Sequence, residues 1–311
     1  MTRIQQVKWE LEMDYIGHPY YVSGNAIYHA LVHSVSGSVH QQLHVSHGVF
    51  TPGQFGRFPE EHSESGTRSY LGSVLPDVET YDDLFLFRHP DHQWLLDSRP
   101  RDAVNVHPLR TQHRQPALAY QTIMGRPEDS RKGQQTTPWY VTAYIHADDP
   151  AVLPLDDTTL DNVQFGGQRN YGYGVASLKD AQVVNLDALD YSRLEDADAY
   201  LIEMVTPFVL ETEYPGANDC DIPWWWSADD TECLRMRTEK IVEDRNAFDL
   251  RTVDHGQVVS YEWDRPVETA RNGILRFGSH SKYGFGELRV KPVEPQDEVP
   301  HENVRGSPKT V

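Results

Sequence analysis

The alternation of apolar and polar residues at the start of the chain predicts a strand followed by a helix. Residues 4–16, IQQVKWELEMDYI, alternate in this way and run into a Gly-His-Pro turn signal. Residues 23–35, SGNAIYHALVHSV, begin with the capping residues Ser23 or Asn25 and carry apolar residues at helical spacing. We therefore expect the chain to open with a strand, a turn and a short helix.

The same order of elements is expected twice along the chain. The first half continues with a strand at 139–147, a short helix within 156–163 and a strand at 173–186. The second half shows strands at 199–213 and 253–263, a short helix at 266–275 and a last strand at 287–293. Strands interleaved with short helices in this way predict an α+β fold.

The domain organisation follows from this repeated order and from the length of 311 residues. We interpret residues 1–195 and residues 196–293 as two tandem domains, each a split βαβ, ferredoxin-like (RRM-like) unit. Residues 47–133 alternate short strand-like runs with loops rich in Pro, Arg and His, and we interpret them as an insertion on the first domain. Residues 294–311 are Pro-rich and charged, which predicts a disordered tail.

One glycine-rich phrase occurs once in each half, as FGGQRNYGYGVASL at 165–178 and as FGSHSKYGFGELRV at 277–290. Aligned without gaps, the copies match Phe165 with Phe277, Gly166 with Gly278, Tyr171 with Tyr283, Gly172 with Gly284 and Gly174 with Gly286. Each copy follows the last expected helix of its half and precedes the last expected strand. We therefore expect a glycine-rich loop at the same place in both domains.

The composition of the phrase suits contact with a phosphodiester backbone. Closely spaced glycines permit positive φ angles, and successive N–H groups in such a loop form a concave anion site. Tyr171 and Tyr283 offer flat faces on which bases can stack. A tight turn with aromatic residues packed beneath it is the competing interpretation. A dinucleotide-binding loop is disfavoured, because such a loop follows a strand and opens a helix, whereas this phrase does the reverse.

The net charge of −19 argues on its own against nucleic acid. Lysine is scarce while Asp and Glu are abundant, a bias typical of halophiles that accumulate salt, so the charge describes the solvent in the cell and not the ligand. Several cations gather in or beside the two phrases: Arg169, Lys179, Arg276, His280, Lys282, Arg289 and Lys291. Their clustering against an acidic background favours an RNA ligand.

Membrane contact, metals and cofactors are not expected from the sequence. No apolar run is long enough to span a bilayer, so we expect a cytoplasmic protein. The two cysteines, Cys220 and Cys233, are too few for a disulfide framework and fit no common zinc pattern.

At the glycine-rich phrases the chain resembles the RAMP superfamily of CRISPR-associated proteins. In that family a glycine-rich loop lies between the last helix and the last strand of a ferredoxin-like domain, which is where FGGQRNYGYG and FGSHSKYGFG are expected. GHPYYVSGNAIYHAL is similar to the family's first turn and helix, and VDHGQVVSYEW is similar to the strand that precedes the second loop in its two-domain members. The resemblance implies binding or processing of CRISPR RNA.

Both copies of the phrase supply residues that are expected to face this RNA. In the first copy they are Gly166, Gly167, Arg169, Tyr171, Gly172 and Gly174. In the second copy they are Gly278, His280, Lys282, Tyr283, Gly284 and Gly286. The first copy departs from the strongly basic loops that are common in the family, because Arg169 is its only cation.

In that superfamily, the subunits that hold the 5′ repeat-derived tag of the guide RNA often have a glycine-rich loop in each half. The resemblance therefore favours a non-catalytic subunit of a CRISPR effector complex, which holds this tag beside other subunits. The superfamily's processing nucleases usually have one such loop and a histidine near the first helix as general base. That region of this chain is rich in histidine: His18, His29, His33, His40, His44 and His47. A metal-independent endoribonuclease is therefore the alternative function.

His29 and His33 are the candidate bases of that alternative, because histidine can take the proton of a 2′-hydroxyl near neutral pH. Their spacing of one helical turn also suits metal ligands, and it equally suits surface residues of an amphipathic helix. A third function is a protein-assembly subunit without direct RNA contact.

Two further features leave several interpretations open. Trp224, Trp225 and Trp226 cannot all point inward on a regular strand, so local packing, a subunit interface and base stacking are each compatible with them. The insertion carries arginines that either grip RNA or a neighbouring subunit or lie in solvated loops: Arg57, Arg88, Arg110 and Arg114.

Overall fold

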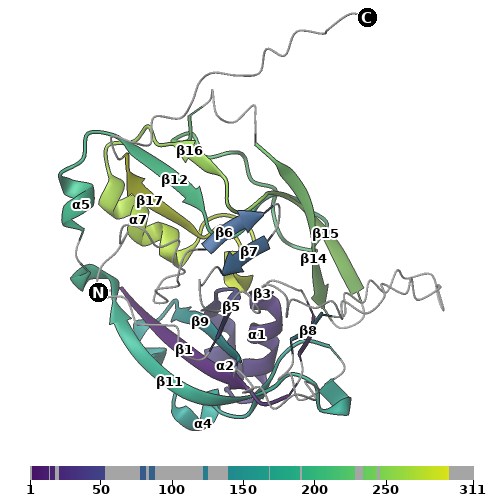
Figure 1. Cartoon of the computed structure of the whole chain (residues 1–311). Helices are drawn as coiled ribbons and strands as arrows, with labels where there is room; N and C mark the ends of the chain where they lie inside the picture. The colour runs from purple at the N-terminus through teal and green to yellow at the C-terminus, as the bar shows by residue number, and fades with distance from the viewer. Residues whose placement is uncertain are drawn as a thin grey trace, which may run out of the picture.

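A computed structural model shows a mixed α+β chain with antiparallel sheets and few helices (Figure 1). It describes residues 2–13, 15–17, 21–52, 78–81, 84–87, 122–124, 139–167, 169–189, 191–227, 234–243 and 246–293. The predicted fold class is therefore confirmed at this level.

The first half is built on a seven-stranded antiparallel sheet. Its strands lie in the order β10 (Val163–Gln164), β11 (Val175–Asn185), β1 (Arg3–Leu11), β9 (Trp139–Ala147), β5 (Gly48–Pro52) and β3 (Tyr21–Val22), and β4 (Leu43–Val45) also pairs with β9. The strand β1 lies between β11 and β9 and pairs with both. Val7 and Trp9 of β1 are fully buried, which places the centre of this sheet in the core.

Short helices cover one face of this sheet. The helix α1 (Gly24–Val32) begins where the sequence predicts, because the hydroxyl of Ser23 accepts a hydrogen bond from the amide of Ala26 (3.2 Å). Ile27 and Leu31 of α1 are fully buried in the core cluster that contains Val7 and Trp9. Other helical segments in the described part of this half are α2 (Gly37–Gln42), α4 (Asp157–Leu160), η1 (Pro150–Val152), η2 (Arg169–Tyr171) and η3 (Leu186–Ala188).

Among its described residues, the second half contains two three-stranded sheets and two α-helices. One sheet has the order β16 (Val258–Ser260), β12 (Tyr200–Met204) and β17 (Leu288–Pro292), and the other has the order β13 (Phe208–Thr212), β15 (Asn246–Val253) and β14 (Met236–Glu243). The helices are α5 (Ser192–Glu195) and α7 (Pro266–Leu275). The bounds of α7 agree with the predicted helix.

Two predicted strands of the second half are each interrupted. The strand expected at 199–213 divides at Pro207 into β12 and β13, which belong to different sheets, because proline lacks the N–H that a strand ladder needs. The strand expected at 253–263 contains a turn before β16, where Gly256 has a φ of 72°. In the second half no helix lies in the described stretch between β12 and β13. In the first half, by contrast, α1 lies between β3 and β4.

The two halves share part of their core. Ile274 of α7 is buried together with Ile4, Tyr144, Val184 and Leu186 of the first half. In Figure 1 α7 and the sheet that contains β17 lie on one side of the strands β1, β9 and β11. The two halves are therefore in direct contact through apolar side chains.

Several predictions lie partly or wholly outside the described residues. The tail 294–311, His18, Cys233, Arg57, Arg88, Arg110 and Arg114 are among the residues outside. Beyond β5, the described parts of the insertion at 47–133 are short strands: β6 (Val78–Tyr81) pairs with β7 (Leu84–Phe87), and β8 (Thr122–Met124) pairs with β2 (Tyr15–Gly17). In the described part of the chain no helix has the length and apolar character needed to cross a membrane. The tandem ferredoxin-like organisation with boundaries near residue 195 stays a prediction.

Candidate functional site at the two glycine-rich loops

The two copies of the glycine-rich phrase have the same backbone conformation. The φ angles of matched glycines agree closely: 77° and 76° at Gly166 and Gly278, 87° and 96° at Gly172 and Gly284, and 74° and 78° at Gly174 and Gly286. The amide of Phe165 donates to the carbonyl of Gly174 (2.9 Å), and the amide of Phe277 donates to that of Gly286 (3.0 Å). The repeat in sequence is therefore also a repeat in structure.

Glycine is required where each loop closes. A Cβ at Gly174 would lie 2.9 Å from the carbonyl carbon of Phe165, and a Cβ at Gly286 would lie 3.1 Å from that of Phe277. Since both glycines also have positive φ, any side chain there would combine backbone strain with a steric clash.

Each loop is anchored on a tryptophan of its own half. Phe165 is fully buried and packs edge-on against Trp9, with ring centroids 5.2 Å apart. Phe277 lies 5.4 Å from the ring of Trp225. Aromatic packing beneath a tight turn is thus present in both copies, and it fixes the base of each loop while leaving its tip to other contacts.

The tip of the first loop, η2 (Arg169–Tyr171), projects into solvent. Arg169, Asn170 and Tyr171 are all exposed, and the side chain of Tyr171 is 75% accessible. The amide of the Gln164 side chain donates to the carbonyls of Arg169 (2.7 Å) and Tyr173 (2.9 Å). These two hydrogen bonds from within the loop fix the conformation of its tip.

The tip of the second loop, η4 (Ser281–Tyr283), packs against the first half. The carbonyl carbon of Tyr283 lies so close to Gly24 that a Cβ there would be 2.5 Å from it. A Cβ at Gly284 would likewise lie 2.5 Å from Nδ1 of His47. The ammonium of Lys282 donates to the carbonyl of Gln41 (2.8 Å). We call Gly24, Tyr28, Gln41 and His47 the α1 docking surface.

A group of aromatic and basic side chains forms where the second loop meets this surface. The ammonium of Lys282 lies 4.9 Å from the centroid of the Tyr28 ring. The ring of His40 lies 4.4 Å from that of Tyr28, and the rings of Tyr283 and His29 lie 5.2 Å and 5.7 Å from it. We call these five residues the joint cluster.

The protonation states in the joint cluster follow from its partial burial. Burial, then the charge of Lys282 and then His29, lower the pKa of His40, so its imidazole is neutral near neutral pH. Burial raises the pKa of the Tyr28 hydroxyl, with Tyr283 and Glu243 adding to the effect. Burial lowers the pKa of Lys282, although Asp148 opposes this. The cluster thus combines a neutral imidazole, a phenol and a lysine.

His280, the remaining side chain predicted to face RNA in the second loop, lies inward. Its Nε2 is 2.8 Å from the hydroxyl of Thr212, and its side chain is buried between the rings of Tyr214 and Phe285. Burial lowers its pKa. His280 therefore packs between the second loop and the strands of the second half, while Lys282 and Tyr283 are partly exposed.

A second polar contact between the halves lies beneath the second loop. Arg276 is buried and donates to Nδ1 of His146 (2.9 Å) and to the carbonyl of Ser281 (2.9 Å). The His146 ring stacks on that of His44 at 4.5 Å, and Nε2 of His44 is 2.9 Å from the carboxylate of Asp148. Burial, then Arg276 and then His44, lower the pKa of His146 to about 2, so that it remains a neutral acceptor.

The histidines named from the sequence are thus divided by the structure. His29 belongs to the joint cluster, whereas His33 is exposed at the end of α1 and contributes to no described site. The sequence did not single out Tyr28 or Arg276 for these roles, and His40 was one histidine among many. Among the described residues, no three His, Cys, Asp or Glu side chains are grouped so as to hold a metal ion.

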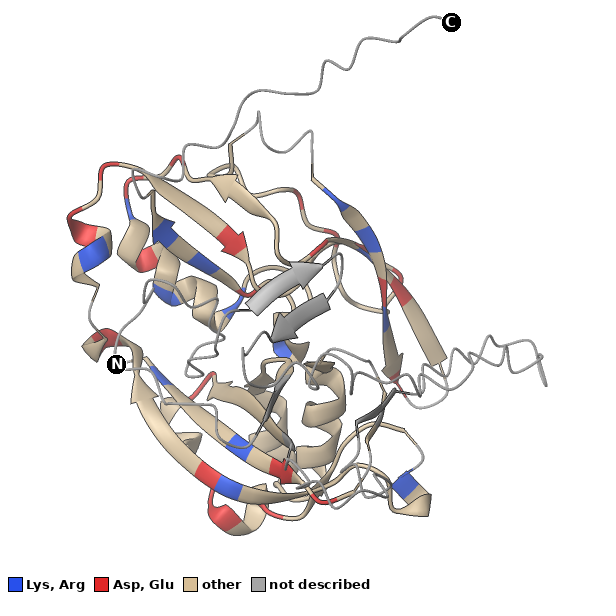
Figure 2. Ribbon diagram, in the orientation of Figure 1, with Lys and Arg blue, Asp and Glu red and all other residues tan. Residues whose placement is uncertain are grey.

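Most described cations elsewhere are paired with carboxylates, and Figure 2 marks where both kinds of residue lie along the ribbon. The pairs are Lys179–Glu10, Arg235–Asp254, Arg237–Glu239, Lys240–Asp249, Arg251–Glu211, Arg265–Glu268, Arg271–Asp187, Arg289–Glu287 and Lys291–Glu203. Within the described residues, Arg169 and Lys282 have no carboxylate within 4.0 Å. Their charges remain available to a phosphate.

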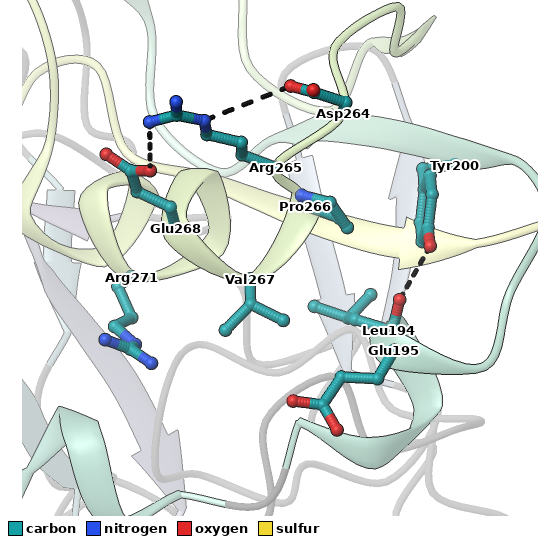
Figure 3. A pocket seen from close by; sticks show the side chains of 9 residues that line it. All are labelled: Leu194, Glu195, Tyr200, Asp264, Arg265, Pro266, Val267, Glu268 and Arg271. Atoms are coloured by element: carbon teal, nitrogen blue, oxygen red, sulfur yellow. Dashed lines mark hydrogen bonds and ion pairs between the residues drawn. The ribbon is translucent and has the colours of Figure 1, made fainter.

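A groove of about 760 Å³ lies on the second half, between α5 and the start of α7 (Figure 3). Figure 3 shows Arg265 between Asp264 and Glu268, and Arg271 pairs with Asp187. Both arginines of the groove are therefore neutralised.

The tryptophan run of the second half has a divided arrangement. Trp225 and Trp226 are buried in the core, whereas Trp224 is 70% exposed and lies 5.4 Å from the ring of Trp263. Local packing therefore accounts for two of the three tryptophans.

Comparison with known proteins identifies no family for this chain. No protein-family model matches it, and no curated protein sequence matches it. Among solved structures, one described as "CRISPR associated protein Cas6" is similar with a TM-score of 0.35 and 10% identity, over 94% of this chain and 100% of that chain. A TM-score this low does not establish a common fold, so function has to be inferred from the residues of this chain.

Proposed function

We propose that the chain is a RAMP-type protein of two ferredoxin-like domains that binds CRISPR RNA, with the RNA held at the joint cluster. In this proposal it is a non-catalytic subunit of a CRISPR ribonucleoprotein and contacts other subunits. The observation that carries the proposal is the position of Lys282: its ammonium lies over the Tyr28 ring and has no carboxylate partner among the described residues.

The chemistry of the joint cluster suits single-stranded RNA. A lysine gains binding energy from a phosphate by releasing counterions, provided that no carboxylate already neutralises it. Aromatic rings beside that lysine offer stacking faces to unpaired bases. Tyr283 and His40 are partly exposed and supply such rings beside Lys282, whereas Tyr28 is buried beneath the lysine. Elsewhere in this acidic chain the described cations are mostly paired, so the cluster differs in charge from its surroundings.

The test is an RNA titration with a matched pair of lysine variants. Fluorescence anisotropy would measure binding of a labelled single-stranded RNA with a repeat-derived 5′ tag to the full chain, at several salt concentrations. We expect Lys282→Gln to weaken binding about tenfold and to reduce the slope of log K against log salt by about 0.7, because one phosphate contact is lost. Lys240→Gln is the control, since Lys240 is paired with Asp249 on β14. Equal affinities for the two variants would refute RNA binding at the joint cluster.

A metal-independent endoribonuclease is a second candidate, and one observation favours it. The Nε2 atom of His40 is buried without a hydrogen-bond partner in the described part of the chain, next to Tyr28 and Lys282. A neutral imidazole can take the proton of a 2′-hydroxyl, whose oxygen then attacks the adjacent phosphorus. The P–O5′ bond breaks, the 5′ oxygen takes a proton from solvent water, and a 2′,3′-cyclic phosphate remains. Lys282 would stabilise the negative charge that develops on the phosphate oxygens.

Cleavage is distinguished from binding by the fate of the RNA. An active nuclease would cut a repeat RNA in the presence of EDTA. It would not cut an RNA that has a 2′-deoxy substitution at the cut site, and the His40→Ala variant would lose activity. His33→Ala is the control, because His33 lies exposed at the end of α1. RNA that stays intact while Lys282→Gln weakens binding would establish the non-catalytic subunit instead.

A further inference from the structure

The first glycine-rich loop has the shape of a docking element but no docking partner among the described residues. Its backbone matches the second loop in φ angles and in the closing hydrogen bond. The second loop uses this shape to pack tightly on a protein surface, the α1 docking surface. The first loop holds the same shape while its tip lies in solvent.

The docking of the second loop defines what such a loop recognises. Its backbone approaches Gly24, at the start of α1, so closely that a side chain there would not fit. The ring of Tyr283 then packs edge-on against Tyr28, one turn further along that helix. The surface that fits the loop is therefore a helix that begins with glycine and carries an aromatic ring one turn later.

The first loop offers the corresponding groups. Tyr171 aligns with Tyr283 and is 75% exposed. Tyrosine is enriched among the residues that contribute most to protein–protein binding, where its ring is buried by the partner. Gln164 holds the loop tip in place before any partner binds, through its bonds to the carbonyls of Arg169 and Tyr173. A tip fixed in advance loses little conformational entropy on binding.

The charges around the first loop favour protein over RNA. In the first loop Asn170 occupies the position that Lys282 has in the second loop. Arg169 is therefore the only cation of the first loop. Two exposed carboxylates flank the strand that leaves the loop: the amide of Glu12 donates to the carbonyl of Val175, and the carboxylate of Asp161 accepts from the amide of Leu178. Phosphates close to this loop would meet that negative charge.

We propose that the first loop docks onto a partner protein, through Tyr171, at a helix that begins with glycine and carries an aromatic ring one turn later. The partner is a different protein and not a second copy, because the α1 docking surface of each copy is already covered by its own second loop. The proposal does not depend on RNA binding at the joint cluster. RNA contact by Arg169 and Tyr171, as expected from the sequence, is the competing outcome.

The experiment places a benzophenone amino acid at position 171 of the full chain in its host, with position 183 as the control. Val183 is an exposed residue of β11 in the same half, at 41% accessibility. After irradiation and nuclease treatment, mass spectrometry identifies the crosslinked peptide. We expect one protein partner from position 171, crosslinked at a glycine-begun helix and absent from position 183.

The outcomes separate the two ligands. A crosslink to RNA at position 171 would overturn the proposal, and so would a diffuse set of crosslinks or one that position 183 also gives. A second measurement uses ordinary variants of the purified complex: Tyr171→Ala should lower retention of the crosslinked partner about tenfold or more, while Val183→Ala leaves it unchanged. RNA retention should be the same in both variants, and a loss of RNA in Tyr171→Ala alone would contradict docking onto protein.

Discussion

Replacing Gly24 by alanine tests whether the second loop packs on the first half as described. Gly24 is the first residue of α1 and follows the capping residue Ser23, and a Cβ there would lie 2.5 Å from the carbonyl carbon of Tyr283. Gly37 is its matched control, since it is the first residue of α2, follows Ser36, and would place a Cβ in open space. Both changes add the same methyl group at the same position of a helix.

The expected loss of stability comes from moving the second loop away from α1. An ordinary carbon contact needs about 3.5–4.0 Å, so the loop must shift by about an ångström or more. The contacts at risk are the Tyr283–Tyr28 ring pair, the Lys282–Tyr28 contact and the hydrogen bond from Lys282 to Gln41. Together these contacts stabilise the folded state by about 1.5–4 kcal/mol. Replacing glycine by alanine in a helix stabilises by up to about 1 kcal/mol, which offsets part of the loss. We expect Gly24→Ala to lower the free energy of unfolding by about 0.5–4 kcal/mol.

Urea unfolding at one fixed high salt concentration measures this difference, because salt screens the repulsion between the many carboxylates. Gly37→Ala should be neutral or stabilise by up to about 1 kcal/mol. Gly24→Ala should also weaken RNA binding, since Lys282 moves with the loop. If the two variants unfold at the same urea concentration, the close packing of the second loop on α1 is refuted.

Two other predictions concern the second loop and the polar contact beneath it. Since the pKa of His146 is lowered to about 2, against 6.5 for an ordinary histidine, the native state binds fewer protons than the unfolded chain between these values. We expect stability to be greatest above pH 6.5 and to fall as the pH drops toward 2, and His146→Gln to flatten this dependence in urea unfolding. Gly286→Ala should destabilise by more than Gly216→Ala, because both have positive φ but only Gly286 would bring its Cβ against backbone. Equal losses for the two glycines would show that crowding at Phe277 is absent.

Local signals in the sequence account for much of the fold. The helical bounds of α7 and the cap of α1 were predictable because periodicity and capping act over a few residues. The strand at 139–147 was predictable for the same reason. The interruption at Pro207 was not predicted, because the apolar run on both sides resembles one continuous strand. The hairpin of β14 and β15 was missed, since its alternation is weak and its side chains are largely polar.

The shape of the candidate site was predictable, but its surroundings were not. Repeated glycines indicate positive φ at fixed positions, so equivalent loops follow from the sequence. That the second loop is covered and the first is not depends on contacts such as Gly24 with Tyr283, which join distant parts of the chain. The grouping of Tyr28, His40 and Lys282 depends on the same packing, and no local pattern reports it.

The joint between the halves also sets an order of events during synthesis. Lys282 and its acceptor Gln41 are 241 positions apart. At about 5–20 residues per second, roughly 12–48 s pass between their emergence from the ribosome. Throughout that interval the first half presents Tyr28 and the start of α1 uncovered. On a crowded polysome the second loop of a neighbouring nascent chain can reach this surface first, so slow translation of the second half would favour dimers formed by loop exchange.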